Sequence, residues 1–460
     1  MTLRRTPGEI PDNEASRMAK AVKPYLRESQ KTSTVGEGGT GRSTATENAV
    51  ICGGTTPTGT HQSVASVGTA GQVLTSNGAG QMPTFQDTIG ESGFTTQDAA
   101  ITLDQATHYG NINQLTGSTN RTWAFTASAT LGAAWFCWVR NAGTAELTLD
   151  PDGAETIDGL TSFIMYPGEM RRIHCTGTAF HSIVISTFLV EYLTTSAFTK
   201  PPGYQAFDTE LWAGGGSGSK GVASTQCGGG GGGGYKKVRV LSSSVGTTET
   251  VTIGAGGVAQ TVATTVGNVG GNTTFGSFAT AYGGGGGGPG DGSGVGSGGG
   301  GGGGGSLGRG ESGGNNGGSG AGSGDGGGPL GGSGTNSGNG TDSMYGGSGG
   351  GESSASDPRA GGSSYWGGAG GGGGGDASNA GGAGGTSVYG GGGGGGSAYD
   401  SSPGPGAGGA SEMGGDGGAG AYDTNVGTTG SVPGGGGGGS EAGNSGAGGA
   451  GKAIISGVMN

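Results

Sequence analysis

Residues 283–451 form a glycine-rich tract broken by short inserts, and this tract sets the strongest limit on how the chain can fold. Glycine makes up 127 of the 460 residues, and most of it lies here. A collagen triple helix requires glycine at strictly every third position together with much proline. Uninterrupted runs such as Gly298–Gly305 and Gly391–Gly396 break that period, so collagen is excluded.

Two physical states remain open for the tract. One is a disordered, low-complexity linker, which is the default for this composition. The other is a packed array of extended polyglycine II helices with three residues per turn, held together by hydrogen bonds between helices. Ordering a residue costs about 1–2 kcal/mol, whereas a hydrogen bond contributes only about 0.5–1.5 kcal/mol. An ordered array must therefore pair nearly every backbone amide.

The non-glycine residues of the tract favour the array. Within the glycine runs they are mostly alanine and serine, whereas bulky residues cluster between the runs, as at Tyr365-Trp366 and Tyr399-Asp400. A linker under no packing constraint does not need this separation. We therefore predict a packed array whose bulky side chains lie at turns.

The remaining composition excludes several classes of function. Apolar residues are only 30% of the chain and the formal net charge is −12, so a single large core and binding to nucleic acid are both disfavoured. The four cysteines are widely spaced without CxxC pairs, and we expect free thiols and no metal or cofactor. The start of the chain lacks the apolar segment of a secretory signal.

Residues 1–35 read as a separate N-terminal segment. A helix capped by Asp12 or Asn13 and ended near Pro24 is expected. Small apolar residues follow at helical spacing, namely Ala15, Met18, Ala19 and Val22. So short a helix needs a partner surface to be stable. The segment is either a docking helix for a larger assembly or a frayed terminus.

Residues 36–93 alternate turn residues with short β-branched runs. The phrase Gly71-Gln72-Val73-Leu74-Thr75-Ser76-Asn77-Gly78 contains the hairpin signal Asn-Gly, and Pro83-Thr84-Phe85 follows. This segment resembles the repeat units in the shafts of bacteriophage tail fibres. In such fibres three chains wrap together, so the resemblance implies a homotrimer.

Residues 94–190 carry the densest apolar content. Short strand-like runs alternate with turn signals such as Pro151-Asp152-Gly153, a pattern typical of an antiparallel β-sandwich. The phrase 149–159 is acidic, but turn chemistry explains its aspartates and glycines, and Pro151 spoils a calcium loop. The expected core aromatic residues are Trp123, Phe125, Trp135, Phe136 and Trp138.

Residues 191–282 contain several strands linked by glycine turns. The phrases Phe198–Tyr204, Glu210–Gly216 and Lys236–Val240 keep the order found in the glycine-rich domains of phage tail proteins, which this segment resembles. Residues 452–460, beginning Lys452-Ala453-Ile454-Ile455, match the closing strand of that domain. The resemblance implies a small sheet that forms the base of the tract and receives both of its ends. The expected fold class is therefore mostly β, with a docking helix, a shaft, a sandwich and a base that carries the array.

The residues between the glycine runs are the candidate binding residues. As a set they resemble the variable loops of phage fibre-tip adhesins, which bind outer-membrane proteins or surface glycans of the host. Alternate loops return toward the base, so about half can reach a receptor. An alternative role for each residue is a plug that covers the helix ends. The candidates are Arg309, Met344, Tyr345, Asp357, Arg359, Tyr365, Trp366, Tyr389, Tyr399, Asp400, Tyr422 and Asp423.

Catalytic motifs are absent from the sequence, and its GxGxxG matches arise by chance from the glycine content. We therefore expect no enzyme. The resemblance implies a phage tail fibre or receptor-binding protein that is made in the host cytoplasm and then resides in the virion tail. Its N-terminus would contact other tail or baseplate proteins. The alternative is a structural tail-tip component in which the array is a rigid spacer.

Overall fold

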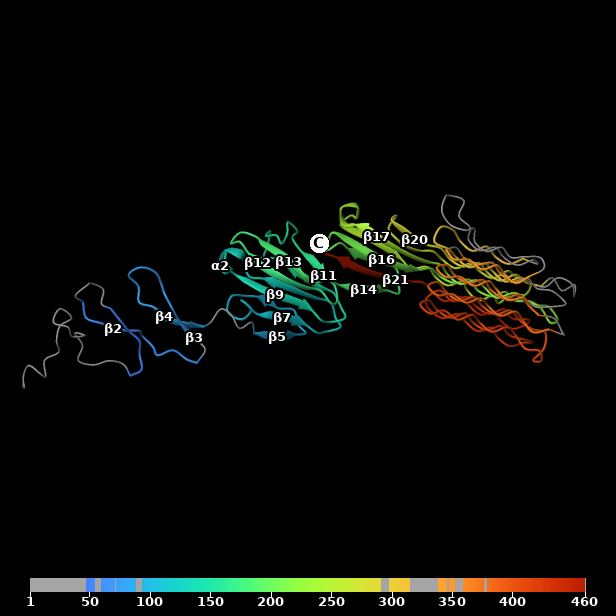
Figure 1. The fold of residues 1–460 in the computed structure, drawn as a ribbon, viewed down its shortest axis with the longest axis horizontal. Helices are drawn as coiled ribbons and strands as arrows, with labels where there is room; N and C mark the ends of the chain where they lie inside the picture. The colour runs from blue at the N-terminus through green and yellow to red at the C-terminus, as the bar shows by residue number, and fades with distance from the viewer. Residues whose placement is uncertain are drawn as a thin grey trace, which may run out of the picture. The chain divides into compact units, whose positions relative to one another are not determined.

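Strands and extended glycine runs account for nearly all of the ordered backbone in the computed structural model (Figure 1). The structure describes residues 47–53, 59–70, 72–87, 93–290, 298–314, 338–345, 347–351, 359–375 and 379–459. Within these, the helical elements are α2 (Ser128–Leu131) and the 3-10 turn η2 (Ser242–Ser244), so the mostly-β prediction is confirmed. The predicted docking helix in residues 1–35 lies outside the described residues. The chain divides into two compact units, Met1–Ser92 and Gly93–Asn460.

The first unit contains two small hairpins. Strand β1 (Ile51–Cys52) pairs with β2 (Gln62–Ser63), and β3 (Gln72–Thr75) pairs with β4 (Thr84–Asp87). The hairpin predicted from Asn77-Gly78 is present, and the Asn77 side chain closes its loop by donating to the Met82 carbonyl at 2.7 Å. Val73 and Leu74 are 47% and 42% exposed. The homotrimer stays a prediction.

The second unit begins with a two-sheet sandwich. One sheet has the strand order β11-β10-β8-β6, and the other has the order β13-β12-β9-β7-β5. Its strands are β5 (Phe94–Gln97), β6 (Thr102–Leu103), β7 (Ile112–Leu115), β8 (Arg121–Phe125), β9 (Phe136–Asn141), β10 (Leu147–Asp150), β11 (Phe163–Met165), β12 (Met170–Cys175) and β13 (Phe180–Ser186).

The prediction that this sandwich is antiparallel is wrong. Strands β5, β7 and β9 pair in parallel, and β6, β8 and β10 do the same in the opposite sheet. The chain crosses from one sheet to the other at each turn, so successive strands within one sheet run in the same direction. Antiparallel pairing begins only where β11 returns along β10 and β12 returns along β9. Turn spacing in the sequence does not distinguish these two ways of winding.

The core of the sandwich confirms three of the five predicted aromatic residues. Trp123, Phe125 and Trp135 are buried, and the Trp123 indole N–H donates to the Ala99 carbonyl at 3.0 Å. The prediction is wrong for Phe136 and Trp138, which alternate with the buried Cys137 and Val139 along β9 and so lie on the outer face of the sheet. A period of two places only every second residue of a strand inside.

A buried ion pair joins the sandwich to the next part of the chain. The Arg171 Nε donates to Glu169 Oε1 at 2.5 Å, and both side chains are fully buried. The same guanidinium donates to the Pro202 carbonyl and to Ser182 Oγ, each at 2.7 Å. Every branch of the guanidinium is therefore used, which is what makes so buried a charge tolerable.

Two four-stranded sheets form the base of the glycine tract, in the orders β14-β21-β16-β17 and β15-β18-β19-β20. The predicted closing strand is present as β21, and it pairs between β14 and β16. The glycine tract therefore leaves the base and returns to its centre. The strands are β14 (Leu189–Tyr192), β15 (Ser196–Thr199), β16 (Ala206–Trp212), β17 (Tyr235–Leu241), β18 (Thr248–Thr252), β19 (Thr273–Phe275), β20 (Ala279–Ala281) and β21 (Lys452–Val458).

The glycine runs pack side by side through hydrogen bonds that repeat every third residue. The run 228–234 shows the pattern, with N···O distances of 2.7–3.0 Å. Its amides donate in turn to three neighbouring runs: Gly229 and Gly232 to Gly372 and Ala369, Gly230 and Gly233 to Gly437 and Gly434, and Gly231 and Gly234 to Gly285 and Tyr282. A repeat of three residues per turn with bonds only to neighbours is the repeat of the polyglycine II helix that we predicted.

The carbonyls of this run complete the arrangement. They accept from three further runs, at 213–219, 298–305 and 390–398. The run 228–234 thus has six hydrogen-bonded neighbours, three as donor and three as acceptor. Such an arrangement leaves no room for side chains: a Cβ added to Gly231 would overlap the carbonyl oxygen of Gly302.

The Arg171–Glu169 pair gives a first prediction. Changing Arg171 to Met should lower the free energy of unfolding by about 3–5 kcal/mol at neutral pH, because it leaves a buried carboxylate without its cation. Burial already raises the pKa of Glu169, and loss of the Arg171 attraction raises it further. The destabilisation should therefore be largest above the folded-state pKa and shrink as the pH falls and Glu169 takes up a proton.

Urea unfolding at neutral and mildly acidic pH measures this difference. The double variant Arg171→Met/Glu169→Gln is the control, and it should recover part of the lost stability at neutral pH. Equal destabilisation at both pH values would contradict the account.

The hydrogen-bonded array gives a second prediction. Changing Gly231 to Ala should lower the free energy of unfolding by about 1–3 kcal/mol, the usual cost of overpacking, because a rigid backbone lies in the way. The matched control is Gly314→Ala, where no heavy atom of the described residues lies within 4 Å of the added Cβ. Both variants lose the same unfolded-state entropy, so thermal unfolding of the pair isolates the clash. Equal stability of the two variants would disprove close packing at Gly231.

Candidate functional site

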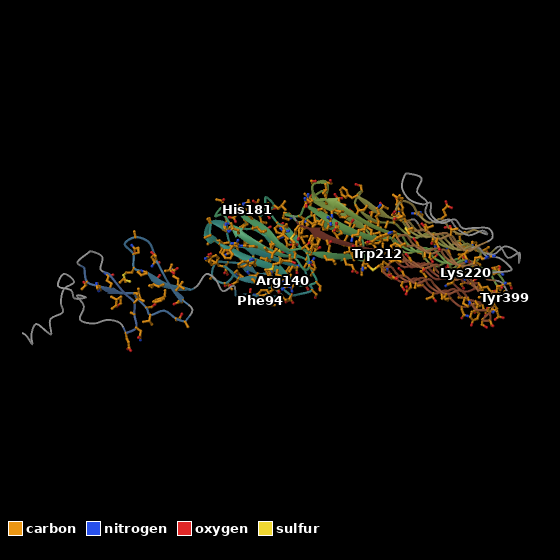
Figure 2. All side chains as sticks on the ribbon, viewed as in Figure 1. Phe94, Arg140, His181, Trp212, Lys220 and Tyr399 are labelled. Atoms are coloured by element: carbon orange, nitrogen blue, oxygen red, sulfur yellow. The ribbon has the colours of Figure 1, made fainter. Side chains whose placement is uncertain are left out.

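The glycine runs go out from the base and come back, so their turns gather at two ends of the array. We call the end beside Trp212 and Tyr235 the base end, and the end beside Lys220 and Cys227 the distal end. Figure 2 shows Trp212 at the base end and Lys220 near Tyr399 at the opposite end. Most of the described candidate residues belong to one end or the other, and only the distal end is free of the base.

Four successive turns stack at the base end. Ser343, Ser364, Ser387 and Ser411 form a ladder of parallel bridges. The residues after each serine continue the ladder: the Tyr365 amide donates to the Ser343 carbonyl at 3.1 Å, and the Tyr389 amide donates to the Tyr365 carbonyl at 3.0 Å. The turns are therefore held in register by backbone bonds, and their side chains form a matching row.

Aromatic rings from these turns pack onto the base. Trp366 stacks on Tyr389 with ring centroids 4.1 Å apart and planes 7° apart, and Tyr389 stacks on Tyr235 of strand β17 at 5.2 Å. The Trp212 indole N–H donates to the Tyr389 carbonyl at 2.8 Å. Trp366 and Tyr389 thus anchor the array to its base. For these two candidates the structure supports the alternative role, in which the side chain covers the ends of the glycine helices.

The distal end carries four of the candidates. Tyr399 is 40% exposed, and Asp400 next to it accepts a bond from the Ser401 amide at 2.6 Å. Tyr422 and Asp423 lie in the next distal turn, and Asp423 has a positive φ of 49°. Backbone strain of this kind concentrates at binding and switch sites, and it persists only where the surroundings fix it.

A buried carboxylate supplies that support. Glu441 is only 4% exposed, and its Oε2 accepts from the Asp423 amide at 2.8 Å. Its Oε1 accepts from the amide of Ser224, a second distal residue with positive φ. One side chain therefore fixes two distal turns that are about two hundred residues apart in the chain. These two turns are therefore fixed relative to each other.

Residues 191–411 match the family model described as a glycine-rich domain. This part of the chain is therefore similar to that family, and we call it the glycine-rich domain. The match begins in β14 and covers the base strands up to β20 and most of the array; the same hydrogen-bond pattern continues beyond it to Gly451. No curated protein shows significant sequence similarity to the chain.

The glycine-rich domain also presents distal residues that sequence reasoning missed. Val222, Val262 and Val426 are 44%, 66% and 63% exposed and lie in or beside distal turns. The predicted candidates were mainly aromatic and charged residues of the tract 283–451. These three residues are aliphatic, and two of them lie before residue 283. The available signal was an isolated β-branched residue inside a turn rich in Gly, Ser and Thr.

The other candidates in the glycine-rich domain are divided. Met344, Tyr345 and Tyr365 are at the base end and are 57%, 51% and 46% exposed, and Arg309 lies in a base-end turn. Arg359 lies in an inward run, where its carbonyl accepts from the Gly373 amide at 3.0 Å. Asp357 lies outside the described residues. The structure thus brings the distal four together at one end and separates them from the rest.

Metal chemistry finds no support in the described part of the chain, where no group of three or more His, Cys, Asp or Glu side chains comes together. The four cysteines are free, and burial raises the pKa of the Cys227 thiol to about 11, so it stays protonated. Among the described residues, no helix has the length and apolar character needed to cross a membrane.

The base-end stack gives a third prediction. Trp366 stacks on Tyr389 and also on Tyr235, with the latter ring centroid 6.1 Å away. Changing Trp366 to Ala removes both pairs and should lower the free energy of unfolding by about 1–3 kcal/mol. Tyr345→Ala is the matched control, since Tyr345 is an exposed aromatic residue of the same ladder. It should change stability by less than about 0.5 kcal/mol. Thermal unfolding distinguishes the two; a silent Trp366 variant would remove the anchoring role.

Proposed function

We propose that the protein is a bacteriophage tail fibre or receptor-binding protein, which attaches the virion to a bacterial surface through the distal turns of its glycine-rich domain. The observation that supports this most is the division of the candidates between the two ends. Trp366 and Tyr389 are used inside the molecule, whereas Tyr399 and Asp400 are exposed at the free end. Asp423 lies at the same end, where Glu441 holds its backbone amide.

The chemistry of the distal turns suits adhesion. An exposed tyrosine offers a flat apolar face and a hydroxyl, and it loses little conformational entropy on binding. Exposed valines add apolar contact, and Asp400 and Asp423 add hydrogen-bond acceptors. Such contacts are weak singly. Several fibres on one virion raise their effective concentration, so weak contacts become avid attachment.

A fourth prediction tests the distal turns. Full-length protein is labelled and its binding is measured on a panel of bacterial strains that differ in outer-membrane proteins and surface glycans. On a strain that binds the native chain, Tyr399→Ser and Val262→Ser should each weaken binding about tenfold, corresponding to about 1.4 kcal/mol. These two residues lie in different distal turns, so their effects should add.

The control is Tyr345→Ser at the base end, which should bind like the native chain. Unchanged binding by both distal variants would remove the distal turns from the site. The alternative function, a structural tail-tip component with the array as a rigid spacer, is favoured if the native chain binds no strain in the panel.

A further inference from the structure

The outer face of the five-stranded sheet in the sandwich is unusual for a surface. Two of its residues, Phe136 and Trp138, were predicted as core, yet they point away from the core because they alternate with buried residues. The same alternation holds along the neighbouring strand β12. We call these outward residues the outer face. They are Phe94, Thr96, Ile112, Gln114, Phe136, Trp138, Arg140, Met170, Arg172, His174, His181, Ile183 and Ile185.

The strand register places these residues in a continuous row across all five strands. Phe94 lies opposite Ile112, and Ile112 lies opposite Trp138. Arg172 lies opposite both Trp138 and Ile183. Neighbours in such a row have their Cβ atoms about 4.5–5.5 Å apart. The row therefore forms a flat aromatic and aliphatic strip with one cation in it, and Figure 2 labels three outer-face residues, Phe94, Arg140 and His181.

The cation in this strip is unpaired. The Arg172 guanidinium carbon lies 4.6 Å from the Phe136 ring centroid and 5.9 Å from that of Trp138. Its Nε is buried and has no hydrogen-bond partner within the described part of the chain. The Oε1 of Gln114, on the same face, is also buried and without a partner there. Buried polar atoms normally have partners, so both side chains have unused hydrogen-bonding capacity, which a small shift of either side chain would bring to a ligand.

The charge of the outer face is opposite to that of the chain. Its outward positions include Arg140, Arg172, His174 and His181 and no Asp or Glu, whereas the chain has a formal net charge of −12. The one carboxylate recorded beside it is Asp158, 3.7 Å from His181 Nδ1 among the described ion pairs. An anionic group is therefore attracted to this face and repelled by most of the remaining surface.

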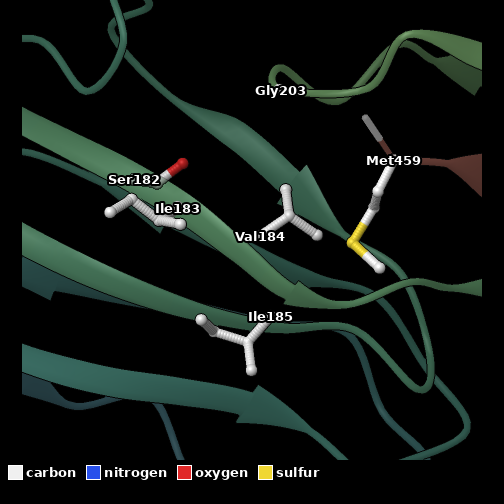
Figure 3. Close-up of a pocket in the computed structure, with 6 residues that line it drawn as sticks. All are labelled: Ser182, Ile183, Val184, Ile185, Gly203 and Met459. Atoms are coloured by element: carbon white, nitrogen blue, oxygen red, sulfur yellow. The ribbon is translucent and has the colours of Figure 1, made fainter.

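A hollow extends the outer face beyond its edge strand. It has a volume of about 470 Å³ and is lined by Ser182, Ile183, Val184, Ile185, Gly203 and Met459. Figure 3 shows the aliphatic side chains of β13 and Met459 around it. Ile183 and Ile185, at 57% and 49% exposed, belong both to the hollow and to the outer face. The outer face and the hollow together are thus longer than one sugar ring, and the end of this surface at β13 is apolar.

We propose that the outer face binds an anionic polysaccharide, one that carries carboxylate or phosphate groups. Sugar rings stack on the Trp138 and Phe136 strip, and Arg172 and Arg140 donate to the acidic groups. Nucleic acid is the poorer fit because its dense phosphates require many cations, and the acidic chain repels them. This site is separate from the distal turns. The proposal therefore does not depend on whether the distal turns attach the protein to a bacterial surface.

Calorimetry and tryptophan fluorescence of the full chain test the proposal, with an oligogalacturonate as the acidic probe and a maltooligosaccharide of equal length as the neutral one. The acidic probe should bind and quench Trp138, and its affinity should fall with added salt. Arg172→Met should weaken binding about tenfold, because a bond to a charged group is lost. Arg140→Met, at an exposed position, is a second variant that leaves the fold intact and should weaken binding in the same direction.

The matched control is Arg239→Met, an exposed arginine on the base that pairs with Asp208 at 2.7 Å. It should bind the acidic probe like the native chain. Equal affinity for the neutral probe, unchanged affinity in both face variants, or tighter binding of a short DNA duplex would each overturn the proposal. So would light scattering that shows an oligomer dissociated by Trp138→Leu, since a second copy of the chain would then cover the face.

Discussion

The hydrogen bond from one glycine run to the next is the interaction on which this molecule depends. Each bond is worth little, and the side chains buried among the described runs are mostly small ones such as Ala369 and Ala398, which add little apolar burial. The array is ordered because the bonds point in three directions from every turn of three residues, so one run is fixed by several others. Only glycine lets the backbones approach this closely, as the overlap of an added Cβ at Gly231 with Gly302 illustrates.

Much of the fold was open to sequence reasoning because the local rules were obeyed. Separation of glycine from bulky residues predicted a packed array. The strand that closes the base was implied by the resemblance of the phrase Lys452–Ile455 to the closing strand of phage glycine-rich domains. The parallel winding of the sandwich was not predictable, because a turn signal records that the chain reverses or crosses but not which sheet it enters. Phe136 and Trp138 were wrongly assigned to the core because the prediction considered their hydrophobicity but not the alternation of side chains between the two faces of a strand.

The sequence indicated which kinds of residue form the candidate site, but not which end of the array each of them occupies. Whether an insert lies at the base end or the distal end depends on how many runs precede it, and the sequence does not mark every turn. Tyr365-Trp366 and Tyr399-Asp400 look alike in sequence, yet the first pair lies against the base and the second lies at the free end. The valines at 222 and 262 were overlooked because single aliphatic residues in turns are common.

The position of β21 has a consequence for how the protein is made. This strand lies between β14 and β16, so residues near 190 pair with residues near 455. During translation the ribosome must produce the whole glycine tract before the centre of its base can form. Until then, the array has one tied end and an incomplete sheet beneath it. Contacts of such long range are slow to form, so the base and array are completed only after β21 has left the ribosome.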